Sequence, residues 1–119
     1  MADPAVIDPR AIENIRSLSP GDNDEFLREI VTIFLEDTPM RITELDDSLV
    51  AGDAPKFTRA AHSIKGSSAN LGATALRLTA ERLEAASRTN GLGGVTSLMD
   101  EVKFEYERAK SALCAVIGT

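Results

Sequence analysis

The sequence predicts an all-α protein, an antiparallel up-down-up-down four-helix bundle with a short N-terminal helix that caps one end. Two observations support this fold class. Apolar residues recur at intervals of three and four along most of the 119 residues, which is the spacing of one helix face. Clusters of glycine, proline and asparagine separate these stretches, and no strand-like alternation lies between hairpin turns. Helices joined by short loops pack as antiparallel neighbours.

The N-terminal half contains two predicted helices. An Asp-Pro pair begins a short helix over residues 8–18, which is too short to be stable alone and should pack as a lid on the bundle. A long helix follows over residues 24–51, with Asp22 or Asn23 as its cap. Pro39 lies inside this helix. We expect a kink there rather than a break, because the apolar pattern resumes in a similar phase.

The C-terminal half contains three more predicted helices. The first begins near Asp53 and stops near Gly72, and the second covers residues 73–88. A loop with three glycines then precedes the last helix, over residues 95–117. The charges of this last helix have mixed signs and suit a solvated outer face.

The helix that ends near Gly72 carries His62, the only histidine of the chain. At about 100° per residue, its buried side should be one arc roughly 100° wide. The members of this arc are Phe57, Ala60, Ala61, Ile64, Ser68 and Leu71. His62 lies roughly 140° from the centre of the arc, so we expect its ring to face solvent.

Two neighbours of His62 are hard to explain by folding alone. Gly66 lies in a helix interior, where glycine costs roughly 1 kcal/mol relative to alanine, and it leaves room beside the imidazole. Lys65 follows His62 by three positions and places an ammonium group near whatever the ring carries. A cation at this position disfavours the protonated ring. The three residues indicate histidine chemistry that involves a phosphate group.

This stretch resembles the signature of the histidine-containing phosphotransfer (HPt) domain family, in which His-x-x-Lys-Gly precedes small residues and a Leu-Gly pair. Here the signature residues are His62, Lys65 and Gly66, followed by small residues at 67–69 and Leu-Gly at 71–72. The resemblance extends more loosely to the following helix and to the whole chain. It implies that residues 1–119 form a single HPt-like domain, of which residues 1–7 would be a flexible tail.

The resemblance also implies a function, as a phosphorelay intermediate of two-component signalling. In HPt proteins the histidine accepts a phosphoryl group from the phospho-aspartate of a receiver domain and passes it to another receiver. By position, the acceptor is His62; Lys65 would screen the charge, and Gly66 would allow close approach. The implied partners are response-regulator receiver domains and a hybrid sensor histidine kinase. Magnesium is expected on the partner receiver domain, with no cofactor bound by this chain and no independent enzymatic turnover.

Four further residues are candidates for the site. We expect Arg59, Ala69 and Met40 to contribute to the surface that binds the partner. Some HPt proteins orient the histidine with a polar side chain on the following helix, which makes Glu84 a candidate for that role. Its position among other charged residues nevertheless favours a solvated glutamate.

Two other functions compete with the relay. One is a helical adaptor that binds receiver domains without being phosphorylated, although an adaptor needs no exposed histidine beside a costly glycine. The other is a histidine-dependent hydrolase such as a phosphohistidine phosphatase, which would need a second general acid or base in a recognisable arrangement.

Composition excludes several other classes. A net charge of −6 and a pI near 4.7 argue against nucleic-acid binding, which needs a basic surface. No apolar run approaches the roughly 20 residues of a membrane-spanning helix. With one histidine and one cysteine far apart, neither an internal disulfide nor an ordinary zinc site can form. We expect a cytoplasmic monomer, and a complete capped bundle that begins at Met1 suggests a free-standing protein.

Overall fold

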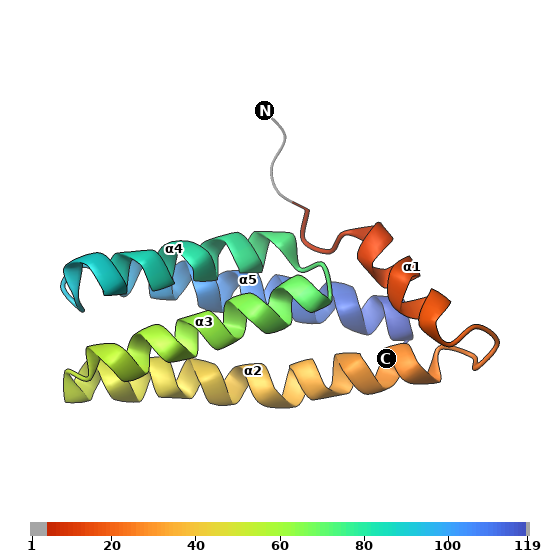
Figure 1. The fold of residues 1–119 in the computed structure, drawn as a ribbon, viewed down its shortest axis with the longest axis horizontal. Helices are drawn as coiled ribbons and strands as arrows, with labels where there is room; N and C mark the ends of the chain where they lie inside the picture. The colour runs from red at the N-terminus through yellow and green to blue at the C-terminus, as the bar shows by residue number, and fades with distance from the viewer. Residues whose placement is uncertain (1–4, 119) are drawn as a thin grey trace.

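Five α-helices follow one another in the order that the sequence predicts, in a computed structural model that describes residues 5–118. They are α1 (Pro9–Leu18), α2 (Glu25–Ala51), α3 (Ala54–Asn70), α4 (Thr74–Asn90) and α5 (Thr96–Ile117). Figure 1 shows α2 to α5 lying along the long axis with alternating direction, while α1 crosses one end. The predicted all-α bundle with a short N-terminal helix is confirmed, and every helix boundary lies within two residues of its predicted position.

Side-chain caps explain where two of these helices begin. The Asp8 carboxylate accepts a hydrogen bond from the backbone N–H of Arg10 at 2.9 Å, at the start of α1. The Asp53 carboxylate accepts one from the backbone N–H of Lys56 at 3.1 Å, at the start of α3. Pro9 follows the first cap directly and Pro55 lies two positions after the second, so that in both helices a proline with its fixed φ lies in the first turn.

The long helix α2 continues without a break through Pro39. At its start, the Asp22 carboxylate accepts a hydrogen bond from the backbone N–H of Phe26 at 3.0 Å, as expected for one of the two predicted caps. The residue next to the helix is Asp24, whose φ of 65° lies in the left-handed region and whose side chain makes no capping bond. This carboxylate instead pairs with Arg16 of α1 at 3.1 Å and ties the two helices together.

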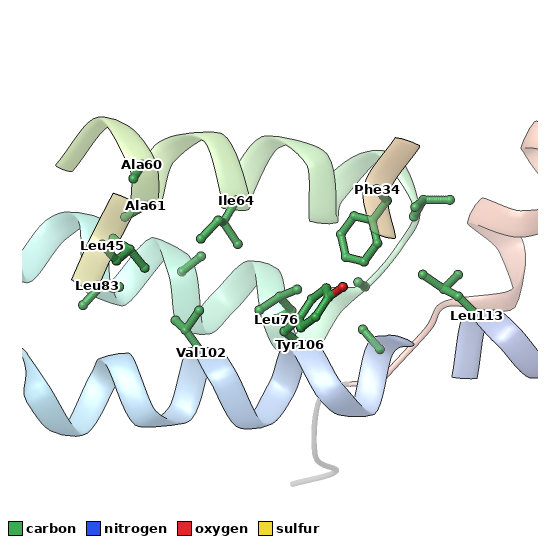
Figure 2. Packing of buried hydrophobic residues seen from close by; sticks show 14 of the residues in the cluster. Phe34, Leu45, Ala60, Ala61, Ile64, Leu76, Leu83, Val102, Tyr106 and Leu113 are labelled. Atoms are coloured by element: carbon green, nitrogen blue, oxygen red, sulfur yellow. The ribbon is translucent and has the colours of Figure 1, made fainter. Parts of the chain in front are cut away.

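The core lies between the four long helices and is closed at one end by α1. Figure 2 shows apolar side chains from α2, α3, α4 and α5 pointing into the same interior. The six predicted core residues of α3 are all at most 3% exposed, which confirms the predicted orientation of this helix. No helix among residues 5–118 is both long enough and apolar enough to cross a membrane.

The turn between α3 and α4 depends on a glycine. Gly72 has a φ of +69°, and a Cβ there would lie 2.5 Å from the Cβ of Ala11. The Gly72 carbonyl also accepts a hydrogen bond from the backbone N–H of Asp8 at 2.8 Å. Only a residue without a side chain allows α1 to approach the turn this closely, so the turn is fixed in place against α1.

Part of the predicted flexible tail contacts the bundle instead. The Ala5 carbonyl accepts a hydrogen bond from the backbone N–H of Ala75 at 3.0 Å, and Ile7 packs against the core. The prediction of a flexible tail is therefore wrong for residues 5–7, because a backbone hydrogen bond and a half-buried side chain attach them. Residues 1–4 of that tail lie outside the described residues.

Candidate functional site

His62 lies in the middle of α3 on the face that points away from the core. Its side chain is 65% exposed, as its angle on the helix predicts. Gly66 is also exposed, and no other part of the described protein lies within 4 Å of a Cβ placed there. Folding therefore does not require a glycine at this position.

A buried carboxylate from the neighbouring helix α4 holds the ring. His62 Nδ1 lies 2.9 Å from Oε2 of Glu84, whose side chain is only 4% exposed. Lys65 Nζ donates to Glu84 Oε1 at 2.8 Å, and Arg88 Nη2 donates to Oε2 at 2.7 Å. We call these four residues the Glu84 cluster. The prediction that Glu84 is a solvated glutamate is wrong, because three partners satisfy a carboxylate that the α3–α4 interface buries.

The charge state of Glu84 determines which ring nitrogen of His62 is available. Burial of the carboxyl raises its pKa, but the hydrogen bonds from Lys65, His62 and Arg88 outweigh burial and lower the pKa of Glu84 to about 2. The carboxylate is therefore ionised at neutral pH and can only accept hydrogen bonds. Nδ1 must then carry the proton, which leaves the lone pair of Nε2 free in the neutral ring.

The antiparallel register of α3 and α4 brings these residues together. One turn before His62, the hydroxyl oxygens of Thr58 and Ser87 lie 2.7 Å apart. His62 lies 8 positions before the end of α3 at Asn70, and Glu84 lies 10 positions after the start of α4 at Thr74. These similar distances from the turn are the sequence signal that points to Glu84. Arg88, which the sequence analysis did not select, follows Glu84 by one helical turn and thus lies on the same face.

The other predicted site residues, Arg59, Ala69 and Met40, lie outside the Glu84 cluster and are exposed. Arg59 lines a shallow hollow of about 370 Å³ beside His62, together with Thr58, Ser63 and Arg88. Ala69 is exposed on α3, one turn beyond Lys65, and Met40 of α2 is 58% exposed. Their contact with a partner stays a prediction.

Two of the three exposed large apolar residues of α2, Ile33 and Met40, lie on the side of the helix away from α5. Lys103 of α5 pairs with Asp46 at 2.9 Å, which identifies the edge of α2 that faces α5. At 100° per residue, Ile33 and Met40 lie on the opposite side of the exposed arc from Asp46. Both are more than half exposed. Because α2 packs between α3 and α5, these two apolar side chains lie on the edge of α2 that is nearer α3.

Other candidate sites in the structure do not involve His62. A hollow of about 690 Å³ lies between α4 and α5 around Phe104, and none of the predicted site residues lines it. Within residues 5–118, no group of three His, Cys, Asp or Glu side chains is arranged to hold a metal ion.

Comparison with known proteins identifies the family. Residues 29–112 match the Hpt domain. The chain belongs to the Hpt domain family. The resemblance that His62, Lys65 and Gly66 indicate is thereby confirmed for most of the length of the chain.

Proteins similar to this Hpt domain come from three different organisms. It is 31% identical over 99 residues to Multistep phosphorelay regulator 1 of Schizosaccharomyces pombe, covering 83% of this chain and 34% of that protein. The chain therefore spans about a third of that relative's length. The crystal structure of histidine-containing phosphotransfer protein B from Pseudomonas aeruginosa PAO1 matches with a TM-score of 0.87 and 25% identity, over 98% of this chain and 97% of that one. A histidine-containing phosphotransfer protein of Medicago truncatula shares the fold, with a TM-score of 0.80, 20% identity and coverage of 94% and 76%.

Proposed function

We propose that this Hpt domain is a phosphorelay intermediate: His62 accepts a phosphoryl group from the phospho-aspartate of one receiver domain and passes it to another. The observation that carries the proposal is an exposed imidazole whose Nδ1 is held by the buried, ionised carboxylate of Glu84. That arrangement presents Nε2 to solvent as a nucleophile. The similarity to a multistep phosphorelay regulator supports the same function.

The transfer step needs no proton movement at His62. The Nε2 lone pair attacks phosphorus in line with the leaving oxygen, so the Nε2–P bond forms as the bond from phosphorus to the aspartate oxygen breaks. The aspartate leaves as a carboxylate, and Nδ1 keeps its proton. The ring thereby gains a positive charge, which the Glu84 carboxylate at 2.9 Å offsets. Transfer to the next receiver is the same step in reverse.

Lys65 and Gly66 have separate roles in this proposal. Lys65 holds one carboxylate oxygen of Glu84 at 2.8 Å, so it stabilises the ionised cluster and adds positive charge next to the ring, where it screens the phosphoryl group. A Cβ added at Gly66 would meet no other part of the described protein within 4 Å, and its absence allows the backbone of a receiver to approach His62 closely.

The partner supplies what this chain lacks. The sequence has no glycine-rich phosphate loop and no nucleotide-binding motif, so this domain would carry the phosphoryl group without turnover of its own. The receiver domain would bring the aspartate and a magnesium ion that offsets phosphate charge. A hybrid sensor histidine kinase would be the upstream source, and we place the monomeric domain in the cytoplasm with these partners.

The docking surface we propose combines two helices. The outward face of α3 contributes Arg59 and Ala69 around His62, and α2 contributes the exposed apolar side chains of Ile33 and Met40. Small and apolar residues on this face suit a transient contact, since the carrier must leave each partner after transfer.

Phosphoryl transfer from a labelled receiver domain tests this function. Wild type and His62→Gln are mixed in parallel with a phosphorylated receiver and magnesium. Label should appear on the wild type alone, stable to base and lost in acid. If both proteins bind the receiver and neither takes the label, the domain is an adaptor and the relay proposal is wrong.

A further inference from the structure

The surroundings of His62 differ between its two sides along α3. Toward the C-terminal end lie Lys65 and Gly66. Toward the N-terminal end lies the hollow of about 370 Å³, lined by Thr58, Arg59 and Ser63 of α3 and by Arg88 of α4. A helical side chain leans over the turn that precedes it, so the imidazole leans toward the hollow rather than toward Lys65.

The positively charged side chains around the ring differ in how far they are already bound to Glu84. The Lys65 side chain is 29% exposed, and its ammonium group is bound to Glu84 at 2.8 Å. Arg88 also contacts Glu84, but its side chain is 65% exposed and its guanidinium has five N–H donors, so it can hold the carboxylate and a second anion together. Among residues 5–118, no carboxylate lies within ion-pair distance of Arg59, which is exposed at the edge of the hollow.

We propose that this hollow is the resting site of the phosphoryl group of phospho-His62, with the guanidinium groups of Arg59 and Arg88 as its counter-ions. The inference rests on the proposed function, because it concerns the same phosphorylated histidine. It gives the two arginines a task that Lys65, held by Glu84, is less able to perform. Thr58 also lines the hollow, and its hydroxyl, 2.7 Å from that of Ser87, is a neutral hydrogen-bonding group.

Charge balance supports this assignment. With a neutral ring, Glu84, Lys65, Arg59 and Arg88 leave two positive charges around His62. Phosphorylation at Nε2 adds a dianionic phosphoryl group and makes the ring cationic, which leaves one positive charge. The phosphorylated state is thus closer to neutrality than the free state. Guanidinium groups pair with phosphate oxygens through two parallel N–H bonds, which also fixes the orientation of the group.

The phosphoryl group itself reports on its counter-ions. Wild type is phosphorylated with phosphoramidate, in which ammonia leaves with the electron pair of the broken P–N bond as Nε2 bonds to phosphorus. The pKa of the phosphoryl group is then read by titrating its ³¹P chemical shift. Arg59→Gln should raise this pKa by about 0.5, the effect of removing a unit charge about 6 Å away in a water-like dielectric. Arg88→Gln should raise it similarly, and Arg59→Lys should restore most of the difference.

Two variants serve as controls. Lys110→Gln removes one positive charge from an exposed position on α5 and should leave the phosphoryl pKa within about 0.1 of wild type. Lys65→Gln should raise the pKa less than Arg59→Gln does. Because Arg59 is exposed and no carboxylate of the described residues pairs with it, its replacement should leave the amide NMR spectrum nearly unchanged outside the site.

Three outcomes would overturn the inference. One is that Arg59→Gln behaves like Lys110→Gln, and another is that Lys65→Gln gives the largest rise. The third is that phosphoramidate leaves His62 unmodified, which would contradict the proposed function as well. Transfer from a labelled receiver separates the two proposals. If no receiver phosphorylates His62 but the arginine variants still raise the phosphoryl pKa, the relay proposal is wrong and the anion site in the hollow stands.

Discussion

Two of the carboxylates that link neighbouring helices in this bundle, Asp46 and Glu84, differ strongly in burial. Asp46 of α2 pairs with Lys103 of α5 at 2.9 Å, with side chains 48% and 42% exposed. Glu84 of α4 is 4% exposed and bonds His62, Lys65 and Arg88. An exposed pair contributes roughly 0 to 1 kcal/mol to stability. A buried carboxylate costs desolvation energy that its partners must offset, so burial of Glu84 is better explained by what it does to His62 than by stability.

The largest difference between the two carboxylates should be in phosphoryl transfer. Glu84→Ala removes the group that fixes the Nδ1–H tautomer. We expect the transfer rate from a phosphorylated receiver to fall roughly 10- to 100-fold, the range seen when metal-binding histidines lose the partner that orients them. Asp46→Ala is the matched control and should transfer at the wild-type rate. Rapid-quench measurements with the same receiver give both rates. Equal rates for Glu84→Ala and wild type would show that the ring needs no orientation from α4.

The stability that Glu84 contributes should depend on pH. The folded-state pKa of Glu84 is lowered from 4.5 to about 2, so its stabilising contribution is present above about pH 4.5 and is lost as the pH falls toward 2. The full shift corresponds to about 3 kcal/mol, and solvent around His62 and Arg88 should reduce this to about 2 kcal/mol.

Urea unfolding between pH 6 and pH 2.5 measures this loss. Glu84→Gln cannot titrate at that position, so its free energy of unfolding should fall less steeply than that of wild type over this range. Parallel curves for wild type and Glu84→Gln would mean that the carboxylate is not held by its three partners.

A smaller effect is expected at Gly66, one helical turn after His62. Nothing else in the described protein lies within 4 Å of a Cβ at this position, so Gly66→Ala should raise the free energy of unfolding by about 0.5 to 1 kcal/mol. Transfer from a receiver should nevertheless slow, because the added methyl group meets the partner. If Gly66→Ala is more stable and transfers at an unchanged rate, Gly66 has no role in the close approach of a receiver.

Local signals were sufficient to predict the helices and the position of His62. The caps at Asp8 and Asp53 and the glycine at Gly72 mark helix boundaries, and the apolar spacing on α3 gives its buried face. These features depend on residues close in sequence. The family signature at His62, Lys65 and Gly66 is local as well.

The partners of His62 could not be predicted in the same way. Glu84 and Arg88 lie near a run of charges on α4, and nothing within that helix shows that Glu84 is buried. Its burial depends on which face of α4 meets α3, and therefore on the register that the turn at Gly72 sets. A charged residue at the edge of a helix face is exposed or buried according to the partner that the tertiary structure supplies.

Nitrogen NMR of the ring tests the central claim most directly, because His62 is the only histidine and gives two unambiguous ring signals. In protein labelled with ¹⁵N-histidine at pH 8, Nδ1 should carry the proton and Nε2 should be unprotonated. After reaction with phosphoramidate, phosphorus should couple to Nε2 while Nδ1 keeps its proton. A ring protonated at Nε2, or phosphorus bonded to Nδ1, would contradict the conclusion that Glu84 orients His62 for transfer.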